Sequence, residues 1–109
     1  MHVVSSRATV VGVVDPALDG EALVREVRQM VGAGADVLEV ASPADAASVR
    51  AAVDVPVVAP GEIDAEPADD AATVAVAILG GTLAVRTHEA RVARRVADVL
   101  AILVEASRA

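Results

Sequence analysis

The sequence contains no cysteine and no phenylalanine, tyrosine or tryptophan. Without cysteine the chain has no disulfide framework, no thiolate nucleophile and no cysteine-based metal site, which fits a reducing cytoplasm. Without aromatic rings the core has to be built from small aliphatic side chains, which suit close packing of helices on a sheet. We predict one domain over residues 1–109, because the chain is too short for a complete eight-unit barrel of about 250 residues.

Positive charge is also scarce. Lysine is absent, all nine basic residues are arginine, and the formal net charge is −7. Without a basic cluster the chain is unsuited to the phosphate backbone of nucleic acid. Residues 1–7 are polar and lack the apolar region of a secretory signal. No apolar run is longer than residues 74–79, which is far shorter than the ~20 residues of a membrane-spanning helix. We therefore expect a cytoplasmic protein that binds neither nucleic acid nor a membrane.

Strand and helix signals alternate four times along the chain. Apolar segments rich in β-branched residues predict strands at residues 8–14, 37–41, 55–59 and 82–85. Amphipathic or capped segments predict helices at residues 19–31, at 42–53, from Pro67 to residue 79, and after His88. In the last helix the pattern places Val92, Val96, Val99, Leu100 and Leu103 inside and Arg91, Arg94, Arg95 and Asp98 toward water. The continuous apolar character of the first strand implies burial on both faces, as in a parallel sheet. The pattern predicts an α/β protein of four βα units.

Parallel strands joined by helices leave two architectures open. Helices on both faces give a small open doubly wound sheet, whereas helices on one face give half of a TIM-type barrel with an open inner face. The simplest cover for that face is a second copy related by a two-fold axis, so that two open sheets close into one eight-stranded barrel. We expect the half barrel completed by homodimerisation, with the doubly wound sheet as the alternative.

Polar side chains stand where the apolar strands end. Arg86 and His88 lie at the junction of the last strand and its helix, where strand ends and helix N-termini offer oriented N–H donors to anions. They predict an anion-binding site, unless Arg86 instead pairs with a neighbouring acid such as Asp15 or Glu39. Asp15, Glu39 and Glu62 lie at or near successive strand ends. They could hold a hard cation such as Mg²⁺ together with waters, or form a solvated acidic rim.

Glu39 is unusual because it interrupts an apolar strand. If its side chain faces a barrel interior, the carboxylate needs a partner. Arg86 is the natural candidate, since the last and second strands of such a barrel flank the first.

Three motifs, in this order, resemble dihydropteroate synthase. Residues 11–16, Val-Gly-Val-Val-Asp-Pro, followed by Asp19 and Gly20, resemble the family's first strand and loop, Asn-Val-Thr-Pro-Asp-Ser-Phe. Residues 30–40, Met-Val-Gly-Ala-Gly-Ala-Asp-Val-Leu-Glu-Val, are similar to its second-strand motif, Gly-Ala-Asp-Ile-Ile-Asp-Val. Arg86 and His88 match the Arg-Xaa-His of the family's last strand, which binds the pyrophosphate of the dihydropterin substrate.

The resemblance covers the two ends of the family's barrel and departs from it elsewhere. Asp15 stands where the family has the asparagine that holds the metal-bound pyrophosphate, and no Thr-Arg pair follows the second strand. The central units, with the pterin-binding residues and the active-site lysine, are absent. The resemblance therefore implies a pseudoenzyme related to a transferase of folate biosynthesis. It would be non-catalytic alone and would bind a phosphorylated or pterin-like anion at Arg86 and His88.

Two other functions stay open. The chain could be an accessory module that self-associates, or that pairs with a full-length enzyme, through exposed strand edges. An active site formed only in a dimer would need a base and an electrophile from both copies, for which Asp15, Glu39 and His88 are the candidates.

Overall fold

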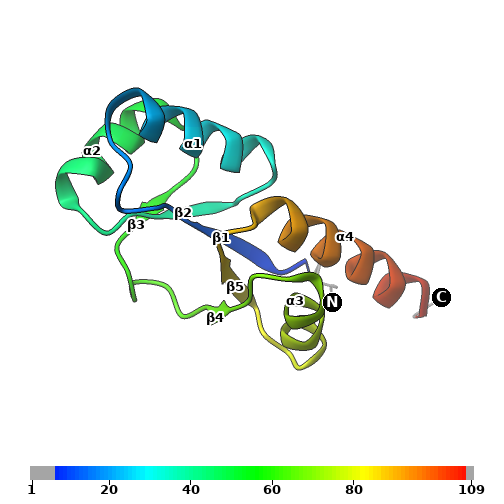
Figure 1. Ribbon diagram of the computed structural model, residues 1–109. Coiled ribbons are helices and arrows are strands. Elements are labelled where there is room, and N and C mark those ends of the chain that lie inside the picture. Colours follow the sequence, from blue (N-terminus) through cyan, green and yellow to red (C-terminus); the bar gives the residue numbers. More distant parts are fainter. Residues whose placement is uncertain (1–6, 108–109) are drawn as a thin grey trace.

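Five strands and four helices follow one another in residues 7–107, the part of the chain that the computed structural model describes (Figure 1). The elements are β1 (Thr9–Val13), α1 (Gly20–Gly32), β2 (Val37–Glu39), α2 (Pro43–Ala52), β3 (Val57–Val58), β4 (Glu66–Pro67), α3 (Ala71–Leu79), β5 (Ala84–Thr87) and α4 (Ala90–Ser107). Residues 1–6 lie outside the described residues, and with them most of the polar N-terminal segment that the sequence analysis distinguishes from a secretory signal.

All five strands are parallel and form one sheet in the order β3-β2-β1-β5-β4. The first and last strands of the chain are therefore neighbours: Val11 of β1 is in register with Val37 on β2 and with Arg86 on β5. The crossovers from β1 to β2, from β2 to β3 and from β4 to β5 all step in the same direction across the sheet. Because such crossovers are right-handed, their helices belong on one face.

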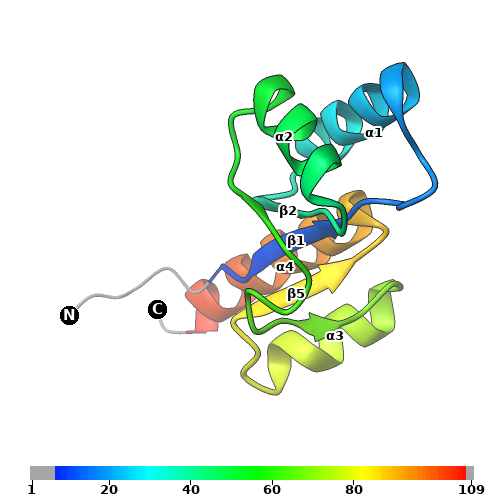
Figure 2. The ribbon, with the colours of Figure 1, turned by 90° about the vertical axis from the view of Figure 1, so that its left-hand side faces the viewer.

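Side chains that alternate along the strands divide into two apolar layers. The main core joins one face of the sheet to all four helices; it includes Val10, Leu38, Val57 and Val85 from the strands and Leu23, Val27, Val49, Val74 and Ala93 from the helices. On the opposite face a smaller cluster contains Val11, Val37 and Val58, against which Ile63 and Ala65 of the β3–β4 connection pack. The helices thus cover one face and the connection crosses the other, which faces the viewer in Figure 2.

The α/β class and its parallel strands are confirmed, and local signals explain several helix ends. Ser42 caps α2 by accepting a hydrogen bond from the backbone N of Asp45 at 3.4 Å. Asp70 and Thr73 form a capping box at the start of α3, in which the side chain of each accepts from the backbone N of the other.

The doubly wound alternative does not describe this sheet, because it requires helices on both faces.

The strand β4 was not predicted. Pro67, placed in the first turn of a helix by the sequence pattern, belongs to this strand, and α3 begins only at Ala71. A two-residue strand has no periodicity, and it exists through its pairing with β5, where Glu66 is in register with Val85. Proline is tolerated there because an edge strand does not need every N–H for the ladder.

The buried face of α4 also differs from the prediction. The pattern places Val92, Val96, Val99, Leu100 and Leu103 inside, but the buried residues of α4 are Ala90, Ala93 and Ala97. Val96 is half-buried and packs against the main core, whereas Val99 and Leu103 are exposed. The small alanines let the helix approach the sheet closely, and its C-terminal half extends beyond the strands (Figure 1). Arg94, expected to face water, has a side chain only 11% exposed. Neither α4 nor any other helix in the described part of the chain is long and apolar enough to cross a membrane.

Candidate functional site

An ion pair between Glu39 of β2 and Arg86 of β5 spans the central strand. Both side chains lie on the face opposite the helices, because Glu39 follows Val37 by two residues and Arg86 is in register with Val11. Arg86 Nε donates to Glu39 Oε1 at 3.1 Å, and Arg86 Nη2 donates to Glu39 Oε2. The side chains are 34% and 8% exposed for Arg86 and Glu39, respectively. The hydrogen bonds to Glu39 are the main cause that raises the pKa of Arg86.

In the structure Arg86 thus pairs with a neighbouring acid, Glu39, which is the alternative to an open anion site. Its guanidinium is bound to a buried carboxylate in the bidentate arrangement that arginine favours. Arg86 also lines a hollow of about 640 Å³ together with Gly61, Ile63, Asp64 and Ala65 of the β3–β4 connection. A ligand in this hollow would meet an arginine whose charge is already largely balanced.

His88 lies beside a different carboxylate, that of Asp69, which follows β4. Asp69 Oδ1 accepts hydrogen bonds from the backbone N of His88 at 2.7 Å and from Thr87 Oγ1 at 3.2 Å, and lies 3.2 Å from His88 Nδ1. The bond from the backbone of His88 is the main cause that lowers the pKa of Asp69 below its ordinary value of 3.8. The donors at the end of β5 are thus occupied by an anionic group of the chain itself.

Asp15 and Glu62 each stabilise a local turn. Asp15 Oδ1 accepts from the backbone N of Ala17 at 2.9 Å, and Glu62 Oε1 accepts from the backbone N of Ala59 at 2.9 Å. Both residues are exposed, whereas Glu39 is buried against Arg86. Within residues 7–107 no group of three or more histidine, aspartate or glutamate side chains is arranged to hold a metal ion. The structure thus does not bring Asp15, Glu39 and Glu62 together into such a group.

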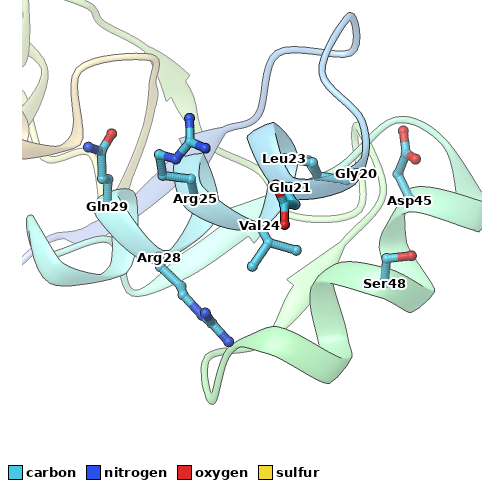
Figure 3. Close-up of a pocket in the computed structure, with 9 residues that line it drawn as sticks. All are labelled: Gly20, Glu21, Leu23, Val24, Arg25, Arg28, Gln29, Asp45 and Ser48. Atoms are coloured by element: carbon cyan, nitrogen blue, oxygen red, sulfur yellow. The ribbon is translucent and has the colours of Figure 1, made fainter.

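A hollow of about 900 Å³ lies elsewhere, between α1 and α2. It is lined by Gly20, Glu21, Leu23, Val24, Arg25, Arg28, Gln29, Asp45 and Ser48. Figure 3 shows these side chains spread along two helices rather than directed at one point. Since neither Arg86 nor His88 takes part in it, this groove is separate from the polar groups at the strand ends.

Asp69 is the site residue that sequence reasoning missed. The sequence pattern placed it inside the first turn of a helix, where an acid is explained by the helix dipole. Recognising residues 66–67 as a strand would have placed Asp69 at a strand end, next to the end of β5. The pairing of Arg86 with Glu39, in contrast, follows from the apolar strand that Glu39 interrupts.

The fold and the site together define an α/β protein with a parallel five-stranded sheet, helices on one face, and paired charges at the strand carboxyl ends. A scan against models of known protein families and a search of curated proteins find no significant match to the chain.

Proposed function

We propose that the protein is a dihydropteroate-synthase-like half barrel that is non-catalytic alone and binds a phosphorylated or pterin-like anion at Arg86 and His88. The order of the strands supports the half barrel. In a closed barrel the first and last strands are neighbours, and here β5 lies beside β1, as the two ends of a barrel would without its central units. The presence of all four helices in one core on one face of the sheet supports it further.

The contact of Asp69 with Thr87 and His88 is the observation that carries the binding proposal. A backbone N–H, a hydroxyl and an imidazole nitrogen converge on one carboxylate oxygen, at 2.7 to 3.2 Å. This is the donor set of an anion site, and charge-assisted hydrogen bonds of this kind also suit a phosphate oxygen. Because the side chain of Asp69 is 57% exposed, it can turn away into solvent when an external anion takes its place.

The absence of catalysis is supported by the engaged state of the charged groups. Both carboxylate oxygens of Glu39 accept hydrogen bonds from Arg86, so Glu39 is not available as a general base without losing its partner. The chain contains no lysine, so the active-site lysine of the family that it resembles has no counterpart.

A calorimetric titration with dihydropterin pyrophosphate and with inorganic pyrophosphate, each with and without Mg²⁺, tests the proposal. We expect saturable binding that weakens in His88→Ala, whose side chain is 60% exposed and so dispensable for folding. Turnover with aminobenzoate is expected to be absent. A folded protein that gives no heat with either ligand would rule out the anion site, and turnover would rule out the pseudoenzyme.

Asp69→Asn is expected to tighten pyrophosphate binding about tenfold, which corresponds to about 1.4 kcal/mol. The substitution keeps the shape of the side chain but removes the negative charge that competes for the donors of Thr87 and His88. Asp70→Asn is the matched control: it removes a charge one residue away, asparagine caps helices as well as aspartate does, and no bond joins Asp70 to His88 in the described residues. Equal tightening in both variants would mean that only the net charge matters.

The same contact predicts a dependence of stability on pH. The pKa of Asp69 is lowered in the folded protein, so the charged carboxylate stabilises the fold. This stabilisation is fully present above the ordinary carboxyl pKa of 3.8 and is lost as the pH falls through the lowered pKa. Thermal unfolding of the wild type and Asp69→Asn, measured from pH 7 downwards, is therefore expected to give a stability difference that shrinks below about pH 4. A difference that does not change with pH would place the origin of the effect outside this carboxylate.

A second candidate function is an accessory module that self-associates or pairs with a full-length enzyme. It is favoured by six large apolar side chains with exposed fractions of 54% to 85%: Val76, Leu79, Leu83, Val99, Ile102 and Leu103. Patches of this kind mark interaction surfaces. For a homodimer these side chains, from α3, α4 and the turn before β5, are better suited than the open face of the sheet, because the β3–β4 connection already packs on that face. Two five-stranded sheets would also close into ten strands instead of eight.

A further inference from the structure

Of the two cationic residues in the proposed anion site, only His88 can change its charge near neutral pH. Arg86 is always charged, but its guanidinium donates to both carboxylate oxygens of Glu39, so that its charge is balanced within the protein. A histidine side chain gains or loses its charge between about pH 5 and 8. The positive charge that the site can offer to an external anion therefore depends on one proton.

The two ring nitrogens of His88 lie in different surroundings. Nδ1 lies 3.2 Å from Asp69 Oδ1, whereas Nε2 has no hydrogen-bond partner in residues 7–107. In a neutral imidazole one nitrogen donates and the other accepts. Because the carboxylate of Asp69 favours the hydrogen on Nδ1, Nε2 presents a lone pair to an incoming anion. Protonation converts Nε2 into a donor and leaves the contact of Nδ1 with Asp69 in place.

The hollow beside His88 contains more negative than positive charge as long as the imidazole is neutral. It has a volume of about 560 Å³, lies between the end of α1 and the start of α4, and is lined by the charged side chains of Glu26, Glu89 and Arg91. Asp69, which follows β4, adds a third carboxylate next to the ring. One guanidinium does not balance these acids, so electrostatic repulsion opposes an external anion until His88 is protonated.

We propose that this site is a pH-dependent switch, which takes up an external anion together with a proton on Nε2 of His88. The proton provides both a hydrogen-bond donor and the positive charge that Arg86, held by Glu39, does not provide. Asp69 is also attracted to the imidazolium, but it carries one negative charge whereas sulfate carries two, so protonation favours the external anion over Asp69. This inference rests on the anion binding proposed above and concerns its regulation.

Calorimetric titration with sulfate at about pH 5.5 and about pH 8 tests the switch. Sulfate keeps its two charges throughout this range, so a change in affinity belongs to the protein. We expect the affinity for sulfate to be about tenfold higher at the lower pH, as is typical of a coupling between two bound species. Near neutral pH the measured heat is expected to depend on the ionisation enthalpy of the buffer, because the complex takes up a proton.

Three variants locate the proton. His88→Gln is neutral at both pH values, so its sulfate binding is expected to be weak and independent of pH. His88→Lys is charged at both, so it is expected to bind at about pH 8 as the wild type does at about pH 5.5. His2→Gln removes the other histidine of the sequence and is the control, expected to behave like the wild type. Circular dichroism checks that all three variants are folded.

The outcomes distinguish the switch from the anion site on which it depends. Equal affinity at the two pH values, or the same pH dependence in His88→Gln as in the wild type, would overturn the role of this proton and leave the anion site in place. If pyrophosphate binds but sulfate does not, the same comparison is made with pyrophosphate, because His88→Gln then reports the pH dependence of the ligand itself. No heat with either anion at either pH would rule out the anion site.

Discussion

Arg86→Ala is expected to lower the free energy of unfolding by about 3 kcal/mol, measured by urea denaturation at fixed protein concentration. The substitution leaves the carboxylate of Glu39, which is 8% exposed, without the guanidinium that balances it. Removing one partner of a buried pair is costly because the remaining charge stays desolvated. The expected loss lies at the lower end of the usual range, because Arg86 itself is 34% exposed and water can reach part of the site.

The double variant Glu39→Leu with Arg86→Met separates burial of charge from loss of packing. It removes both charges and keeps apolar volume over β1, so we expect its stability to lie within about 1 kcal/mol of the wild type. If Arg86→Ala alone costs less than about 0.5 kcal/mol, the pair behaves as an exposed surface pair. Such a result would leave Arg86 available to an external anion.

This stability effect determines how the anion titration has to be interpreted. A loss of binding in Arg86→Ala supports a direct role only at a temperature where the variant is folded, since an unfolded chain binds nothing. His88→Ala and Asp69→Asn avoid the difficulty, because both side chains are more than half exposed. The two variants are expected to change affinity in opposite directions, which a general loss of structure would not produce.

Much of this fold was predictable because its strands and helices carry strong local signals. The first strand is continuously apolar, and the helix α2 begins with Ser42 and Pro43 in their favoured positions. The contact of Glu39 with Arg86 was also accessible, because a carboxylate inside an apolar strand requires a nearby cation. These features depend on residues close in sequence, or on the neighbour relations of parallel strands.

The features that escaped prediction depend on tertiary contacts. The strand β4 is defined only by β5 beside it, so Asp69 could not be placed at a strand end from the sequence. The direction in which α4 packs was misjudged because the helix has apolar residues on more than one side. Its alanines fit closely against the sheet, and the larger Val99 and Leu103 were left outside.

The burial of Arg94 on α4 also depends on tertiary contacts that the sequence pattern does not reveal. Arg94→Ala is expected to lower the free energy of unfolding by about 3 kcal/mol, measured by urea denaturation. Its side chain, 11% exposed, donates to the carbonyl oxygen of Gly34 at 3.0 Å, to Asp98 at 3.2 Å and to Asp36. Asp36 also accepts from the backbone N of Val10 at 2.9 Å. The guanidinium therefore joins α4 to the turn after α1 and, through Asp36, to β1.

The approach of Arg94 to this turn explains the glycine beneath it. Gly34 has a φ of 111°, and a Cβ there would lie 2.4 Å from the Cγ of Arg94, so a side chain at this position would displace the arginine as well as strain the backbone. Arg91→Ala, an exposed arginine on the same helix, is the control and is expected to change stability by less than about 0.5 kcal/mol. If Arg94→Ala also changes stability by less than about 0.5 kcal/mol, the hydrogen bonds of Arg94 in the folded protein are no more favourable than those it makes with water in the unfolded chain. α4 would then be held in place by its apolar contacts, which include Ala90, Ala93 and Val96.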